Sequence, residues 1–332
     1  MSELLSGTAI RPWIERLLAD GKRVAGPQRV HEDLVQYAWL TSADQLALDG
    51  FVRPSNSIKE VVFPRHEQLY GYQFKGKRIE LLPAELPTKE QIVIGARPCD
   101  AAALPALDGV FNWDTQDEFY NRRRELTTVV TLACGAYDAH CFCTSVGLGP
   151  GDVRGSDALL IAVDDENYEV RCLTDKGRRL FAGVTTESSA VGRVMEGPPV
   201  QFDLDKLGAF LAGGYDNPAW QAAAMRCLGC AACAYTCPTC HCFDIVDEGG
   251  PSGGTRVRNW DACQFSMFTA HASGHNPRGN QGQRQRQRIY HKFQIYPEKF
   301  GALLCTGCGN CTRNCPAGLG VLPILKTIAP TP

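Results

Sequence analysis

The chain has 332 residues, of which 44% are hydrophobic and 21% charged, and its formal net charge is −2. This length allows two domains with a sizeable core, and the near-zero charge argues against nucleic-acid binding by bulk electrostatics. Residues 1–30 lack the apolar segment of a secretory signal, and no run of about 18 apolar residues predicts a membrane span. We therefore interpret the 16 cysteines as reduced thiols of a cytoplasmic protein, available as metal ligands rather than as disulfide partners.

The first part of the chain, residues 1–215, predicts a mixed α/β (α+β) domain. "IRPWIERLLADG" (10–21) has the apolar spacing of an amphipathic helix that ends at a glycine. "QIVIGARPCD" (91–100) and "ELTTVVTLACG" (125–135) predict short strands, each followed by a loop that carries a cysteine. "ALLIAVDDENYEVRCL" (158–173) predicts a β-hairpin.

The composition changes near residue 215, so we predict a second domain over residues 216–332 and expect it to be all-helical. "NWDACQFSMFTAHAS" (259–273) and "QRQRIYHKFQIY" (285–296) are the expected connecting helices, and "EGGPSGGT" (248–255) is expected to be a flexible loop. The polar, basic run over residues 276–288 is interpreted as a solvated helix face, with docking to an acidic partner as the alternative.

Two copies of one cysteine motif dominate the second domain. They are "CLGCAACAYTCP" and "CTGCGNCTRNCP", each with the spacing Cys-x2-Cys-x2-Cys-x3-Cys-Pro. In two-cluster ferredoxins the fourth cysteine of each such run binds the other cluster. The sequence therefore predicts one [4Fe–4S] cluster on Cys227, Cys230, Cys233 and Cys315, and a second on Cys305, Cys308, Cys311 and Cys237.

Zinc is a poor alternative, because a tetrahedral zinc site would leave both Cys-Pro dipeptides unexplained. The 67 residues between the motifs favour a helical ferredoxin-like domain over the small compact ferredoxin. Cys240 and Cys242 follow the first motif and are expected to pack beside it, although either could replace a predicted ligand. Cys263 is expected to be a buried small hydrophobe.

A further group of cysteines lies in the first domain. If the segments 91–95 and 128–133 are neighbouring parallel strands, Cys99 and Cys134 meet at one edge of the sheet, and the Cys141-x-Cys143 loop follows directly. These four thiols could hold a third cluster, with Asp100 as a substitute ligand. Inert buried thiols and a zinc site remain as alternatives.

The sequence contains no convincing site for other chemistry. No GxGxxG follows a predicted strand and no P-loop occurs, so neither a flavin nor a dinucleotide site is predicted in this chain. No constellation of acid, base and nucleophile stands out, so no catalytic residue is assigned.

Several segments resemble a known family in the same order along the chain, among them "ARPCDAAAL", "CFCTSVGLGPG", "RCLGCAACAYTCPTCHCFD", "QRIYHKF" and "PEKFGALLCTGCGNCTRNCP". The family comprises the iron–sulfur beta subunits of cytosolic nickel–iron hydrogenases (sulfhydrogenases) and the related iron–sulfur subunits of anaerobic sulfite reductases. The resemblance covers roughly residues 55–325. It implies an electron-transfer subunit placed between a diaphorase subunit, which binds flavin and NAD(P), and a catalytic subunit.

Three functions are carried forward. The leading hypothesis is an electron-transfer subunit of a cytoplasmic oxidoreductase complex, with a nickel–iron hydrogenase favoured over an anaerobic sulfite reductase as the catalytic part. The second is an enzyme that reduces a substrate at the N-terminal cysteines. The third is a redox sensor or scaffold.

Overall fold

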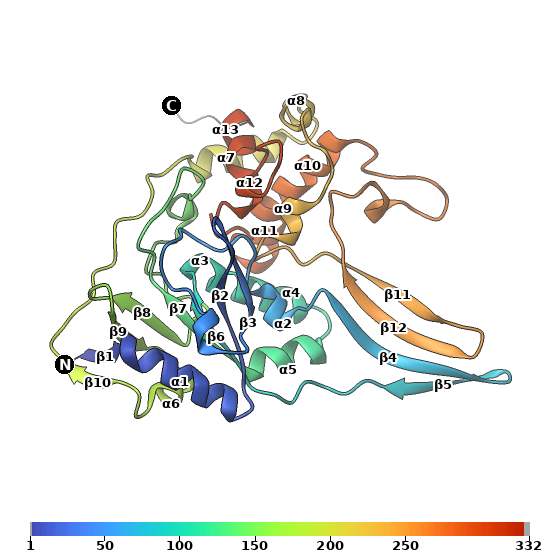
Figure 1. The fold of residues 1–332 in the computed structure, drawn as a ribbon. Coiled ribbons are helices and arrows are strands. Elements are labelled where there is room, and N and C mark those ends of the chain that lie inside the picture. Colours follow the sequence, from blue (N-terminus) through green and yellow to red (C-terminus); the bar gives the residue numbers. More distant parts are fainter. Residues whose placement is uncertain (1, 329–332) are drawn as a thin grey trace.

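The computed structural model describes residues 2–328, and an eight-stranded mixed sheet forms the centre of the N-terminal part (Figure 1). The inner strands β8, β7, β6 and β2 run parallel, and every residue of β6 is buried. The predicted neighbouring parallel strands and the predicted hairpin of β8 and β9 are confirmed. In spatial order the strands are β10 (Thr186–Ser188), β1 (Ser2–Ser6), β9 (Asn167–Cys172), β8 (Ala158–Ala162), β7 (Thr127–Leu132), β6 (Gln91–Ala96), β2 (Arg23–His31) and β3 (Leu34–Trp39).

Helices cover both faces of this sheet, as a buried parallel sheet requires. On one face α1 (Gly7–Ala19), which confirms the predicted amphipathic helix, lies with α6 (Asp175–Phe181), and the rings of Trp13 and Phe181 are 5.0 Å apart. On the other face the rings of Phe111 and Tyr120 stack at 4.2 Å. That face carries α2 (Lys59–Val62), α3 (Pro98–Ala101), α4 (Leu104–Phe111) and α5 (Glu118–Leu126), and the short helices η1 (Ala43–Gln45) and η2 (Cys143–Val146) lie in loops.

The C-terminal part is not all-helical, so that prediction is wrong. Its residues 243–260 form the hairpin of β11 (Phe243–Gly250) and β12 (Gly253–Trp260), and β12 pairs with β4 (His66–Lys75), which pairs with β5 (Arg78–Pro83). This four-stranded antiparallel sheet projects from the body of the molecule (Figure 1). The glycine-rich segment expected to be a flexible loop is the tip of the hairpin, where Gly249 pairs with Gly254.

The predicted helix over residues 259–273 is wrong for the same reason. Trp260 ends a strand: its backbone N–H donates to Arg65 O at 2.9 Å and its indole N–H to Phe63 O at 3.1 Å. Only η3 (Ser266–Thr269) is helical in the rest of that segment. The apolar residues there pack against the other sheet, and no continuous helical face results.

The remaining helices surround the two cysteine motifs. The predicted helix over 285–296 is confirmed as the end of α10 followed by a π-helix, η4. Within residues 2–328, no helix combines the length and hydrophobicity that a bilayer crossing needs. These helices are α7 (Leu204–Gly213), α8 (Ala219–Ala224), α9 (Ala232–Tyr235), α10 (Gln281–Tyr290), η4 (His291–Ile295), α11 (Tyr296–Phe300), α12 (Asn310–Arg313) and α13 (Val321–Ile328).

Buried ion pairs join the two parts of the chain. Arg258 of β12 is only 2% exposed and pairs with Glu67 of β4 and with Asp117, the residue that caps α5. Glu67 also pairs with Arg123 of α5. Because removing one partner leaves buried charge uncompensated, this network fixes the projecting sheet on the N-terminal domain.

Candidate metal centres

The first set of predicted ligands comes together at one pocket. Cys227, Cys230, Cys233 and Cys315 all line it, although the last lies more than 80 residues from the others. Cys230 is exposed and Cys233 is buried, so this set lies at the protein surface. Burial raises the pKa of the Cys233 thiol to about 12.

The second set is buried. Cys237, Cys305, Cys308 and Cys311 are each less than 10% exposed. Burial raises the pKa of Cys305 and Cys308 to about 12, and the neighbouring Cys237 and Cys311 raise both further. Cys237 therefore lies with the cysteines of the other motif, which is the exchange expected from the spacing.

The two motif loops have the same backbone conformation. Gly229 and Gly307, at equivalent positions, have φ of +67° and +64°, and Ala231 and Gly309 have φ of +62° and +75°. A left-handed conformation is costly for a residue with a side chain. Ala231 adopts it all the same, as the one non-glycine residue with positive φ in the described part of the chain.

The cysteines left over from the motifs also lie close by. Cys240 is buried against Cys237, and its pKa is raised well above the ordinary value, first by the hydrogen bond with Cys237. Cys242 and Cys263 form a second hydrogen-bonded pair, which lowers the pKa of Cys263 to about 6. Cys263 is therefore a polar neighbour of Cys242 as well as a packed side chain.

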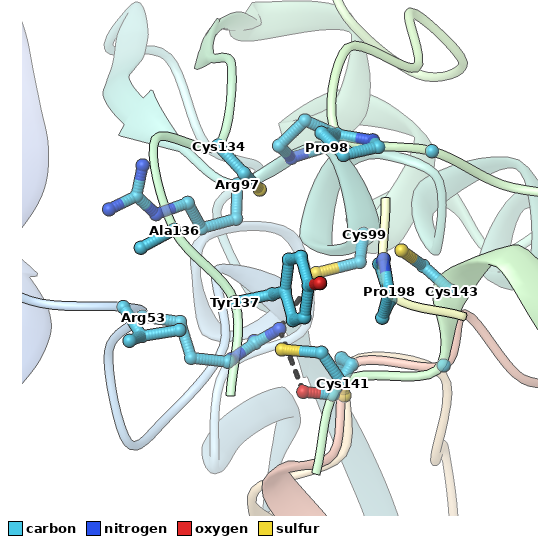
Figure 2. A pocket seen from close by; sticks show the side chains of 15 residues that line it. Arg53, Arg97, Pro98, Cys99, Cys134, Ala136, Tyr137, Cys141, Cys143 and Pro198 are labelled. Carbon is cyan, nitrogen blue, oxygen red and sulfur yellow. Dashed lines mark hydrogen bonds between the residues drawn. The ribbon is translucent and has the colours of Figure 1, made fainter. Parts of the chain in front are cut away.

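The four N-terminal cysteines converge on a pocket of their own. Cys99, Cys134, Cys141 and Cys143 line it together with Cys308 of the second set. Figure 2 shows their side chains around one space, which the side chain of Arg53 also approaches. Cys99 and Cys134 come from the ends of the parallel strands β6 and β7, as predicted.

Asp100 is not directed at this pocket. Its side chain is fully buried, and its two oxygens accept hydrogen bonds from Arg53 at 2.9 and 3.0 Å and from Tyr37 at 3.0 Å. Arg53 in turn donates to Cys99 Sγ at 2.7 Å and to Cys308 O at 3.4 Å. The carboxylate thus holds a guanidinium between the N-terminal cysteines and the second set.

A second arginine makes the equivalent connection. Arg313 donates to Cys141 Sγ at 3.1 Å and to Cys308 O at 2.7 Å, and Asp138 orients it through contacts of 2.6 and 2.7 Å. The N-terminal pocket and the second set are therefore tied together by two arginines that converge on one carbonyl.

Comparison with known proteins adds to this geometry. Residues 226–319 match the family model "4Fe-4S dicluster domain". The chain is 28% identical over 319 residues to "Sulfhydrogenase 2 subunit beta" of Pyrococcus furiosus, with 92% of each chain covered. The chain fits the iron–sulfur beta-subunit family. No solved structure matches it.

The residues of this iron–sulfur chain fit metal clusters in two respects. Buried thiols with raised pKa values become thiolates when they bind a metal. In addition, Arg97 Nε and Arg288 Nε and Nη2 are buried without a hydrogen-bond partner within residues 2–328. Such donors need acceptors, and inorganic sulfide would be one. Within the same residues, no three Cys, His, Asp or Glu side chains are grouped as around a single ion.

Sequence reasoning missed the cations at these sites. Arg53, Lys59 and Lys292 are buried, and Lys59 donates to Cys240 O at 2.9 Å. Nothing near Arg53 or Lys59 in the sequence indicates a cluster. Lys292 alone had a signal, since it lies in the "QRIYHKF" segment of the family resemblance.

Proposed function

We propose that this chain is the electron-transfer iron–sulfur subunit of a hydrogenase-type complex and has no catalytic centre of its own. The observation that carries the proposal is the exchange of the fourth cysteine between two repeated motifs, which pairs Cys315 with the first loop and Cys237 with the second. The similarity to a sulfhydrogenase beta subunit over 92% of both chains supports the kind of complex.

The two motif sets would each hold a [4Fe–4S] cluster, which takes up and releases single electrons. Cys227, Cys230, Cys233 and Cys315 would bind the first cluster. Cys305, Cys308, Cys311 and Cys237 would bind the second. The matched dicluster domain falls within residues 216–332, which supports the domain division near residue 215.

The N-terminal cysteines Cys99, Cys134, Cys141 and Cys143 would hold a third cluster. Their common pocket and the orphaned Arg97 Nε beside it support this assignment. Because Asp100 is committed to Arg53 and Tyr37, it would serve as a support for Arg53 rather than as a ligand.

The partners would be a diaphorase subunit, which binds flavin and NAD(P), and a catalytic subunit, in a cytoplasmic complex. The printed name of the relative, which makes it one subunit of a sulfhydrogenase, supports assembly with other chains. The exposed Cys230, with the exposed apolar side chains of Leu228, Met225 and Met267 nearby in the chain or pocket, offers one surface for such a contact.

Iron and acid-labile sulfide analysis of the anaerobically purified chain tests the proposal. Three four-cysteine sets predict about twelve irons and about twelve sulfides per chain, because each [4Fe–4S] cluster takes four cysteines. About eight of each would restrict the proposal to the two motif sets. Zinc, or iron without sulfide, would overturn it.

A further inference from the structure

One face of a single helix contacts both motif sets. Gln281, Gln285, Arg288 and Lys292 are spaced four, three and four residues apart on α10 and η4, so they share one helical face. We call these four residues the donor stripe. The face is not solvated as predicted from its polarity: Gln285, Arg288 and Lys292 are 1–2% exposed.

The N-terminal end of the donor stripe contacts the first set. Gln281 and Gln285 each donate an amide N–H to Cys227 Sγ at 3.1 Å. Both side chains are neutral, so at this end the sulfur receives hydrogen bonds from the stripe without a charge.

The C-terminal end contacts the second set with a cation. Lys292 Nζ donates to Cys237 Sγ at 3.4 Å, and Thr239 Oγ1 and Leu304 O, each at 3.0 Å, accept its other hydrogen bonds. Lys292 lies in the π-helix η4, an irregularity that is frequent at functional sites. Three fixed acceptors hold the ammonium group beside this sulfur.

Arg288 lies between the two ends. Its Nη1 donates to Gln285 Oε1 at 3.2 Å, whereas Nε and Nη2 have no partner among the described residues. Burial alone would lower its pKa, yet the surrounding cysteines, Cys233 and Cys311 foremost, raise it. Because these two cysteines belong to different sets, the guanidinium is close to both.

We propose that the donor stripe gives the two cluster sites different reduction potentials, with the potential of the second site higher than that of the first. A positive charge and hydrogen bonds to sulfur stabilise the more negative, reduced state of a cluster. Lys292 supplies a charge to the second site alone, the two glutamines supply only neutral donors to the first, and Arg288 is shared. This inference rests on the proposed function.

Anaerobic redox titration of the full-length chain, followed by electron paramagnetic resonance, tests the proposal. Lys292→Met should lower the midpoint potential of the second site and leave the first unchanged. Arg288→Gln should lower both. Lys292→Arg, which keeps the charge, should stay near the wild-type values. The second-site signal is identified by its change in Cys305→Ser.

The matched control is Arg286→Gln on the same helix, since Arg286 donates to Tyr215 O at 3.0 Å and to Asp216 instead of approaching a cysteine sulfur. It removes the same charge and should move neither potential. If Lys292→Met loses iron, Lys292→Gln removes the charge and keeps a donor, and the same downward shift is expected.

The outcomes separate the two proposals. Normal signals whose potentials do not change in the variants at residue 292, or change equally at both sites, would overturn the role of the donor stripe alone. Wild-type protein without iron–sulfur signals would overturn the proposed function itself.

Discussion

Replacing Cys141 with serine should remove about four of about twelve irons and leave the other two sites loaded. Cys141 lines the N-terminal pocket and receives a hydrogen bond from Arg313 at 3.1 Å. It is absent from both motif sets, so its loss should affect only the third site. Iron and sulfide assays together with the resonance spectrum measure the result.

The control for this variant is Cys172→Ser. Cys172 ends β9 in the same domain, and its Sγ lies 3.8 Å from Glu3 Oε2 rather than in the pocket. The substitution should leave the iron content unchanged. About eight irons in both the wild type and Cys141→Ser would contradict the third cluster and leave the motif sets intact.

Local spacing accounts for what could be predicted about the sites. Three cysteines at every third position of a short loop must face one volume, whatever the rest of the fold does. Cys99 and Cys134 follow adjacent parallel strands, β6 and β7, so the sheet itself brings their thiols together. In both cases the information lies within a few residues of the cysteine.

The error over the second sheet has the opposite cause. β12 pairs with β4, which lies about 180 residues earlier in the chain. Neither segment alone shows that the other is its partner, because strand pairing is a non-local interaction. The cysteine-rich sequence around β11 and β12 suggested a helical ferredoxin-like domain, and the strands within it were overlooked.

The buried cations were missed for a related reason. Arg53 reaches Cys99 and Cys308 from a loop 46 and 255 residues away, so its role depends on tertiary structure. The basic run before Lys292 looked like a solvated face because polar residues are usually exposed. Here the polar side chains have buried sulfur and carbonyl acceptors, which reverses that expectation.

The two motif loops differ in a way that the packing explains. A Cβ on Gly307 would lie 2.5 Å from backbone atoms of Phe142 and Cys143, and one on Gly309 would lie 2.4 Å from His140 O. Phe142 N also donates to Gly307 O at 2.9 Å. The second loop is therefore pressed against the N-terminal cysteine loop, and glycine is needed at both positions.

The first loop has no such neighbour. A Cβ on Gly229 would meet nothing closer than the flexible end of Gln281, at 3.3 Å. The position equivalent to Gly309 is occupied by Ala231, which shows that a methyl group is tolerated there. The same backbone conformation thus carries different side-chain restrictions in the two copies.

Gly307→Ala should consequently cost about eight of about twelve irons, whereas Gly229→Ala should retain nearly all of them. Both substitutions place a side chain at a positive φ, which costs about 1–2 kcal/mol. Only Gly307→Ala also forces backbone atoms apart, and this displaces Cys308 and the Cys141–Cys143 loop together. Iron analysis of the two purified variants measures the difference. If both variants lose iron equally, the strain of the left-handed backbone is sufficient and the contact between the loops contributes little. If Gly307→Ala loses iron from the second site while the N-terminal site stays loaded, the two sites do not depend on one shared contact.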